Sequence, residues 1–417
     1  MEKYSEYQLT DIEWLPQIPK HWNLETLRRF LRMVSVKNHP EKPLLSVTRE
    51  SGVIVRDVES KEENHNFIPE DLSGYKYVEV GDFCINKMKS WQGSYGVSEY
   101  EGIVSPAYYI CKLNGVERRF FSVAIRSINY VSFFAQYSKG IRVDQWDLSP
   151  IGLKTIPFFL PPLNEQHSIV SYLDKKCSLL DTLLSNKEKE ISLLQEMKQR
   201  VIADAVTRGV NPNVKFKATN IPWLPEIPEH WEMSKVSSHF RQRNMKVSDK
   251  EYPALSVSKM GVTPQLDNVA LSNAEGNSRK LVKVGDYAVN SRSDRKGSCG
   301  VSKYEGSVSL ITIVLEPFDI DRGYVHYLFR SNPWIEEFYR NGRGIVADLW
   351  TTNYQMMKGM YLPIPPLSEQ RAIVSYITER TSKIDTLIEK LTKEIECVKE
   401  YKQRLISDVV TGQVKVC

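Results

Sequence analysis

Apolar residues recur at steps of four and three along two long stretches of the sequence, and these stretches predict two long helices. The first covers about residues 164–207 and the second about residues 368–411. Charged residues flank each apolar line, as they do beside the contact seam of a coiled coil. A helix of about forty residues is a rod of about 60 Å, so each helix is expected to pair with the other. The predicted seam contains Leu173, Leu180, Leu184, Ile191, Leu194, Ile384, Ile388, Leu391, Ile395 and Val398.

Matching residues at both ends indicate that the second helix repeats the first. Each begins after Pro-Pro-Leu and continues with x-Glu-Gln, where x is Asn164 in the first copy and Ser368 in the second. Both residues are expected to cap the first turn of their helix. Gly209 and Gly412 are expected to end the helices, because glycine readily adopts the left-handed conformation of a helix C-terminus. Taken alone, such helices could serve only to dimerise the protein.

The duplication extends over the rest of the chain. The strap WLPQIPKHW at residues 14–22 returns as WLPEIPEHW at residues 223–231, with seven of nine residues identical. Residues 93–105 match residues 297–309 at ten of thirteen positions, and their glycines and alternating apolar residues predict strands and tight turns. The repeated module therefore consists of a strap, a globular domain and a long helix.

The predicted fold class is α+β, with two α/β globular domains joined by two long antiparallel coiled-coil helices and an internal pseudo-twofold duplication. Within each globular domain, one amphipathic helix is predicted, over residues 119–137 in the first copy and 322–341 in the second. The predicted domain boundaries, in chain order, are 1–163, 164–210, 211–367 and 368–417.

The charge distribution and the cysteine content limit how the chain could bind nucleic acid and in which compartment it is expected. Residues 1–210 carry 27 basic and 27 acidic side chains, and residues 211–417 carry 29 and 24, so the whole net charge of +5 lies in the second part. Contact with nucleic acid would therefore depend on local basic patches. The six cysteines are scattered without a C-x-x-C pair, as expected in a reducing compartment. With no apolar signal region and no apolar run of membrane-helix length, a cytoplasmic location is expected.

No motif for catalysis is found in the sequence. The phosphate-binding loop G-x-x-x-x-G-K-[ST], the dinucleotide motif G-x-G-x-x-G, the nucleophile elbow G-x-S-x-G and the zinc motif H-E-x-x-H are all absent. His21 and His230 have no neighbouring ligand residues at metal-binding spacing, so a structural role is expected for both. The sequence therefore predicts no catalytic residue and no metal site.

Basic and amide residues gather in a loop whose flanks are repeated and whose middle differs between the copies. Arg and Lys can pair with guanine edges and Asn or Gln with adenine, and the same groups can contact phosphates. Two related domains that carry different side chains in the same loop would be suited to recognise two different base sequences. The alternative is an ordinary solvated loop. The candidate DNA contacts are Asn86, Lys87, Lys89 and Gln92, then Asn290, Arg292, Arg295 and Lys296, and, more weakly, Lys139, Arg142 and Arg343.

The duplicated strap and the duplicated Pro-Pro-Leu-x-Glu-Gln helix start resemble those of the specificity (S, HsdS) subunit of type I restriction–modification systems. The resemblance covers essentially the whole chain. It implies that the globular parts are target recognition domains, each reading half of a split site in double-stranded DNA. It also implies that the helices act as a spacer and dock two methyltransferase (M) subunits, through which restriction (R) subunits join. S-adenosylmethionine on the methyltransferase and ATP with Mg on the restriction partner are implied, with no cofactor on this non-catalytic chain.

Three other interpretations are considered. A self-contained nuclease or methyltransferase is disfavoured by the missing motifs. A coiled-coil scaffold that binds only proteins is disfavoured by the divergent basic loops. A specificity subunit of a methyltransferase system without a type I motor cannot be separated from the leading interpretation by sequence.

Overall fold

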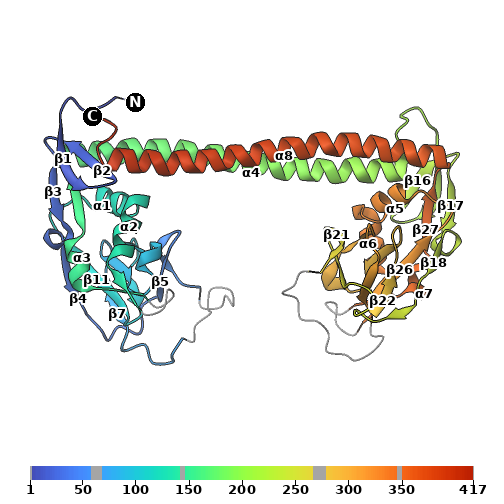
Figure 1. The fold of residues 1–417 in the computed structure, drawn as a ribbon, viewed down its shortest axis with the longest axis horizontal. Coiled ribbons are helices and arrows are strands. Elements are labelled where there is room, and N and C mark those ends of the chain that lie inside the picture. Colours follow the sequence, from blue (N-terminus) through green and yellow to red (C-terminus); the bar gives the residue numbers. More distant parts are fainter. Residues whose placement is uncertain (1, 58–67, 141–145, 266–278, 345–349, 417) are drawn as a thin grey trace. The chain divides into compact units, whose positions relative to one another are not determined.

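The computed structural model describes residues 2–57, 68–140, 146–265, 279–344 and 350–416. The chain divides into two compact units, of which unit 1 combines Met1–Lys187 with Lys393–Cys417 and unit 2 is Glu188–Thr392. Each unit contains one globular domain and parts of both long helices, α4 (Leu163–Arg208) and α8 (Leu367–Val410) (Figure 1). The predicted α+β class and both long helices are confirmed.

In unit 1 the beginning of α4 runs antiparallel to the end of α8. Lys402 Nζ donates a hydrogen bond of 2.5 Å to Asp181 Oδ1, and Lys187 pairs with Glu394. A step forward along α4 is therefore a step backward along α8. Leu173 lies in the same hydrophobic core as the end of α8, so the helices also pack onto the domain.

Unit 2 repeats this arrangement with the other parts of the helices. Lys198 Nζ donates to both carboxylate oxygens of Asp385, at 2.6 and 2.7 Å. These two residues are the counterparts, 204 positions apart, of the Lys402–Asp181 pair in unit 1. The same inter-helix ion pair is thus made once in each unit.

The helix starts differ from the prediction by one residue. The carbonyl of Pro162 accepts hydrogen bonds from the backbone N–H groups of Glu165 and Gln166, both at 2.9 Å, and therefore takes the capping position. Asn164, and Ser368 in the second copy, lie inside the first turn, so the prediction that they cap the helices is wrong.

The helix ends agree with the prediction. Gly209, with φ of +77°, directly follows α4, and Gly412, with φ of +71°, lies two residues after the end of α8. Both adopt the left-handed conformation expected of a glycine stop.

The globular domain of unit 1 is built from small antiparallel sheets. A four-stranded sheet has the order β4-β11-β8-β9, and β3 pairs with β14 beside it. The strands are β1 (Tyr7–Ile12), β2 (Leu15–Pro19), β3 (Asn23–Thr26), β4 (Leu31–Val34), β5 (Leu45–Thr48), β6 (Gly52–Val55), β7 (Lys76–Val78), β8 (Phe83–Asn86), β9 (Tyr95–Val97), β10 (Gly102–Val104), β11 (Tyr108–Leu113), β12 (Ser138–Lys139), β13 (Asp147–Leu148) and β14 (Pro157–Leu160).

The globular domain of unit 2 has the corresponding four-stranded order, β18-β26-β23-β24. The matching order supports duplication of one ancestral domain. The strands are β15 (Phe216–Ile221), β16 (Leu224–Pro228), β17 (Glu232–Lys235), β18 (Phe240–Gln242), β19 (Lys246–Val247), β20 (Leu255–Ser258), β21 (Gly261–Pro264), β22 (Arg279–Val282), β23 (Tyr287–Asn290), β24 (Cys299–Val301), β25 (Gly306–Ser309), β26 (Thr312–Pro317) and β27 (Tyr361–Ile364).

The single amphipathic helix predicted in each domain is wrong, because two short helices stand in its place. Ser127 and Ser331 take extended conformations between the two helices of their unit, where a short polar side chain suits a new helix start. Pro333 then lies in the first turn of the second helix in unit 2, which is a favoured position for proline. The helices are α1 (Arg118–Ile125), α2 (Ile128–Gln136) and α3 (Pro150–Thr155) in unit 1, and α5 (Arg322–Leu328), α6 (Asn332–Arg340) and α7 (Tyr354–Met357) in unit 2.

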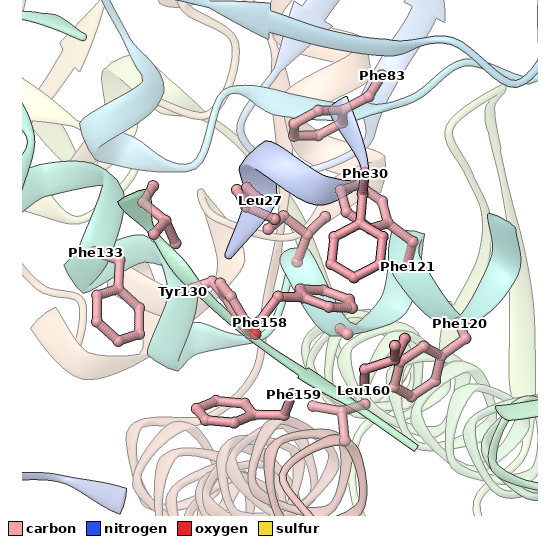
Figure 2. Close-up of a cluster of buried hydrophobic side chains, with 14 of the residues drawn as sticks. Leu27, Phe30, Phe83, Phe120, Phe121, Tyr130, Phe133, Phe158, Phe159 and Leu160 are labelled. Atoms are coloured by element: carbon pink, nitrogen blue, oxygen red, sulfur yellow. The ribbon is translucent and has the colours of Figure 1, made fainter. Parts of the chain in front are cut away.

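The hydrophobic core of unit 1 explains why the apolar pattern continues across the junction between α1 and α2. Figure 2 shows Phe120 and Phe121 of α1, Tyr130 of α2 and Phe158 of β14 gathered in one cluster in unit 1. All four side chains are fully buried. Since α1 and α2 both bury aromatic residues in the same core, the apolar pattern extends across the junction between them.

Candidate nucleic-acid interface

The two predicted contact loops are each anchored by their first amide residue. Asn86 Oδ1 accepts a hydrogen bond from Met88 N (3.2 Å), and Asn290 Oδ1 accepts one from Arg292 N (3.1 Å). Asn86 is buried, and its Nδ2 donates to Tyr108 Oη (3.2 Å). These amides therefore hold the turn of the loop, and the residues after them carry the exposed charge.

In unit 1 the loop lies against the hairpin of β12 and β13. Leu148 N donates to Lys87 O (3.0 Å), and Lys87 Nζ lies 2.9 Å from Asp147 Oδ2. The hydrogen bond to Asp147 raises the pKa of Lys87 above its ordinary value. Lys139 pairs with Asp147 in the hairpin register, and Lys89 is exposed. The structure thus brings three predicted cations, Lys87, Lys89 and Lys139, into one region.

Two predicted residues of unit 1 are placed differently. Gln92 is half-buried and lines a cavity of about 320 Å³ together with Gln403 and Ile406 of α8, so it faces the helices. Arg142 lies outside the described residues.

In unit 2 the corresponding loop carries more cations and more carboxylates. Arg292 Nε and Arg295 Nε lie 3.5 and 3.6 Å from the carboxylate of Asp294. Lys296 Nζ lies 2.9 Å from Glu336 Oε2, on α6. The charged ends are accessible, since the Arg295 and Lys296 side chains are 67% and 48% exposed.

Arg343 joins this loop through the backbone of Thr351. The N–H and C=O groups of Arg343 and Thr351 form two hydrogen bonds of 3.1 Å, and Thr351 also forms a bridge with Arg292. The structure therefore brings together both groups of candidates that are distant in the sequence of unit 2.

Arg126 and Arg330, in the segments that connect the two short helices of each unit, have structural roles. Arg126 Nη1 donates to Tyr95 O (2.6 Å), and Arg330 Nη1 donates to Cys299 O (2.7 Å). Each guanidinium also bonds backbone carbonyls in a neighbouring turn. Burial lowers the pKa of Arg126. Its hydrogen bonds to backbone carbonyls compensate for the water that the buried guanidinium has lost.

The predicted seam residues all lie on sheltered faces of α4 and α8. Leu173, Leu184, Ile384 and Ile395 are buried. The others are half-buried, and they are Leu180, Ile191, Leu194, Ile388, Leu391 and Val398.

The repeated strap is fixed to the repeated helix start by a histidine–glutamate hydrogen bond in each unit. His21 Nε2 lies 2.8 Å from Glu165 Oε2, and His230 Nε2 lies 2.8 Å from Glu369 Oε2. Tyr4 also donates to Glu165. The glutamate of the helix motif thus holds the strap, which gives the two histidines a structural contact.

The glutamine of the helix motif fixes the helix to α1 or α5. Gln166 Nε2 donates to Pro161 O (2.8 Å), and its Oε1 accepts from Glu117 N (2.9 Å), next to the start of α1. In unit 2, Gln370 makes the same pair of bonds, to Pro365 O and from Asp321 N, both at 2.8 Å. Each candidate contact loop is therefore carried on a domain that is hydrogen-bonded to its helix start.

Sequence reasoning missed the aromatic residues beside the loops. In unit 1, the rings of Trp91 and Trp146 lie 5.3 Å apart between centroids. In unit 2, Trp350 is 38% exposed and lines a cavity with Trp223. The signal was present, because Trp146 and Trp350 occupy equivalent places in the two repeats.

Metal clusters and membrane-spanning helices are both absent from the part of the chain that the structure describes. No group of three or more His, Cys, Asp and Glu side chains there is arranged to hold a metal ion. None of the described helices has both the length and the apolar character needed to cross a membrane.

The whole chain is similar to proteins of one kind. No family model matches it. The "Putative type I restriction enzyme MjaX specificity subunit" of Methanocaldococcus jannaschii is 24% identical over 428 residues, covering 96% of this chain and 95% of that protein. The type I restriction enzyme MjaVIII specificity subunit of the same organism is 25% identical over 307 residues, covering 68% of each.

Solved structures show the same fold. A chain of a structure on complex assembly and conformational transition of the type I R-M system has a TM-score of 0.67 at 14% identity, over 95% of this chain and 99% of that one. The HsdS subunit from Thermoanaerobacter tengcongensis has a TM-score of 0.50 at 15% identity, over 95% and 98%. The homologues of this chain are type I restriction enzyme specificity subunits, and its fold is that of HsdS.

Proposed function

We propose that this chain is the DNA-specificity subunit of a type I restriction–modification complex, with each globular domain reading one half of a bipartite site. The observation that carries the proposal is the duplication, in which one fold presents different basic side chains at the same loop. Homology to specificity subunits over nearly the whole chain agrees with it. The recognition domains are assigned to residues 1–163 and 211–367, and the helical regions to 164–210 and 368–417.

The exposed cations carry the proposed DNA contact. Lys89 is exposed, and Lys87, Arg292, Arg295 and Lys296 are paired with carboxylates at partly exposed positions. Exposed pairs of this kind are weak, so phosphate or guanine can replace the carboxylate at little cost. Lys139 and Arg343 extend the two surfaces, and Arg142 remains a sequence-based candidate. Asn86, Gln92 and Asn290 are assigned a smaller part, because their side chains are sheltered or hold the loop.

The outer faces of the long helices support docking of partner subunits. Large apolar side chains are exposed on these helices, and three of the positions recur after 204 residues, as Leu163 with Leu367, Leu183 with Leu387 and Met197 with Tyr401. Exposed apolar surface of this kind marks protein interfaces. Two equivalent surfaces fit two methyltransferase subunits, with restriction subunits joining through them. The further exposed apolar residues are Leu179 and Leu193.

In this proposal the chain itself performs no chemistry and acts in the cytoplasm. Methyl transfer, with S-adenosylmethionine, belongs to the methyltransferase subunit, and ATP with Mg acts on the restriction subunit. This chain selects the DNA sequence at which the complex acts.

The test is transfer of a labelled methyl group from S-adenosylmethionine to unmethylated genomic DNA. We expect incorporation only when the full chain and its methyltransferase subunit are both present. Incorporation by this chain alone would show that it is an enzyme. Equal incorporation by the methyltransferase alone would show that this chain does not direct the reaction.

A further inference from the structure

Unit 2 contains a cavity of about 520 Å³ beside the candidate DNA-contact loop. It lies between the strap, α6 and the loop after β23, and its lining includes Trp223, Ser293, Lys296, Glu336, Tyr339 and Trp350. Its volume falls within the roughly 300–1,000 Å³ that is usual for small-molecule sites. Aromatic side chains and charged side chains therefore face the same space.

The backbone around Trp350 fixes one wall of this cavity. Ser293 N donates to Trp350 O (2.9 Å), and Thr352 N donates to Ser291 O (2.9 Å). Trp350 is nevertheless 38% exposed. A large ring is thus held at the surface by hydrogen bonds of its own main chain to the candidate DNA-contact loop.

Comparison of the two repeats shows what kind of group fits against this wall. In unit 1 the counterpart of Trp350 is Trp146, and the ring of Trp91 lies against it with 5.3 Å between centroids. The residue 204 positions after Trp91 is Arg295, whose side chain is 67% exposed. Unit 2 therefore keeps the aromatic wall but lacks the ring that covers it in unit 1.

We propose that this cavity is a nucleobase-binding site, in which a planar base packs on Trp350 on the side where unit 1 places the ring of Trp91. The rings of Trp91 and Trp146 are tilted by 54°, so the unit 1 pair shows that an aromatic group fits there and does not fix the angle of the base. The proposal rests on the function proposed above, because the adjoining loop would bring DNA to the cavity. Every base has a face that stacks on an aromatic side chain, so stacking needs no particular base.

The charged residues around the cavity favour a nucleobase over an apolar side chain as its occupant. Lys296 and Glu336 form an ion pair at the cavity with 2.9 Å between Nζ and Oε2, and their side chains are 48% and 68% exposed. Glu337 and Arg340 form a second pair in the lining, at 2.5 Å. The edge of a base carries both donors and acceptors that can bond such groups, whereas an apolar side chain carries neither.

The first experiment measures binding of the four deoxynucleoside 5′-monophosphates to the full chain by saturation-transfer-difference NMR. We expect stronger saturation of base protons than of sugar protons in the wild-type protein. Trp350→Ala removes the stacking wall and should reduce affinity at least about fivefold. Absence of base saturation in the wild type would overturn the proposal.

The second variant tests the comparison of the repeats directly. Arg295→Trp gives unit 2 the ring that unit 1 has at Trp91. Arg295 itself does not line the cavity, but a ring at this position should pack against Trp350 as Trp91 packs against Trp146, and should abolish base saturation by covering Trp350. Arg295→Ala is the matched control, because it removes the same guanidinium without adding a ring, and its base saturation should be clearly stronger than that of Arg295→Trp. Thermal unfolding of each variant reports whether the fold is intact. Equal saturation in both variants would overturn the proposal even if Trp350→Ala fails to fold.

A DNA-binding arm identifies the source of the base. In the complex with the methyltransferase subunit, weaker DNA binding by Arg295→Trp than by Arg295→Ala, at least fivefold, would assign the site to a base of the DNA. Equal DNA binding with loss of the nucleotide signal would assign it to a free nucleotide.

If Arg295→Trp blocks assembly with the methyltransferase while no nucleotide binds, the cavity holds a protein side chain, and the nucleobase proposal is wrong. Chain-dependent DNA methylation is measured separately, so failure of the proposed function would be distinguishable from failure of this site.

Discussion

The side chain of Gln166 joins the start of α4 to the start of α1, although it is a single uncharged residue. It is buried and bonds Pro161 O and Glu117 N. Gln166→Ala leaves both backbone groups without these partners, so the free energy of unfolding of unit 1 should fall by about 2–3 kcal/mol. Urea denaturation followed by circular dichroism measures this. Asn164→Ala, at an exposed position two residues earlier, is the control and should change it by less than about 0.5 kcal/mol. Equal losses in the two variants would contradict the assigned role.

His326 on α5 gives unit 2 a dependence on pH. Burial, together with Arg330 and Lys303, lowers the pKa of this imidazole to about 4. The ring is therefore neutral in the folded protein, and between pH 6.5 and 4 the unfolded chain binds one more proton at this residue. The free energy of unfolding should accordingly fall as the pH decreases through this range.

The test compares the wild type with His326→Gln at pH 7.5 and pH 5. Other groups titrate equally in both proteins, so the difference between their losses isolates His326. We expect the variant to lose less stability on acidification, measured as the shift of its urea midpoint. The same loss in both proteins would show that His326 does not remain neutral in the fold.

At the scale of elements, the apolar periodicity correctly predicted the long helices, which bury one continuous stripe of side chains. The apolar steps of four and three identified α4 and α8 to within one residue at each end. The same reasoning failed at Ser127 and Ser331, because α1 and α2, and likewise α5 and α6, bury residues in one continuous core. Side-chain pattern records which residues are buried, whereas the break in the helix depends on backbone angles that the pattern does not contain.

The repeated ion pair between α4 and α8 should contribute to their antiparallel register. A double-mutant cycle with Lys402→Ala and Asp181→Ala measures the coupling energy of the pair. We expect about 0.5–1 kcal/mol, because the Asp181 side chain is 57% exposed and solvent weakens the attraction. The exposed pair Lys383–Glu379, within one helix, is the control and should give about 0.3–0.5 kcal/mol. A coupling energy of zero would show that the Lys402–Asp181 pair does not contribute to the antiparallel register of α4 and α8.

The candidate interface could be predicted from the sequence only in part. Repeated flanks with a changed middle located the loops after β8 and β23, but not the direction of their side chains. Asn86 bonds Tyr108, which lies on the neighbouring strand β11, and no local pattern links the two residues. The contact of Lys87 with Asp147 is likewise made by residues sixty positions apart. Such contacts follow from tertiary packing, which the sequence pattern leaves open.

At the scale of the whole molecule, the proposed function makes the helices a spacer between two half-sites. Inserting one heptad between Glu188 and Gln195, with a matching heptad in α8, keeps the seam in phase because the apolar repeat is conserved. The gap between the half-sites should then lengthen while both half-sites stay the same. Sequencing of the methylated motif measures the gap. Insertion of seven residues into an exposed loop is the control and should leave the gap unchanged. An unchanged gap in the heptad variant would contradict a spacer role.

The most direct measurement is a genome-wide map of N6-methyladenine in cells that express this chain with its methyltransferase subunit, compared with cells that lack this chain. If this chain is the specificity subunit, the map should contain a split motif, with two short half-sites around a fixed unspecified gap, that disappears without this chain. An assembled complex that produces no chain-dependent methylation would contradict the account and favour a scaffold that binds only proteins.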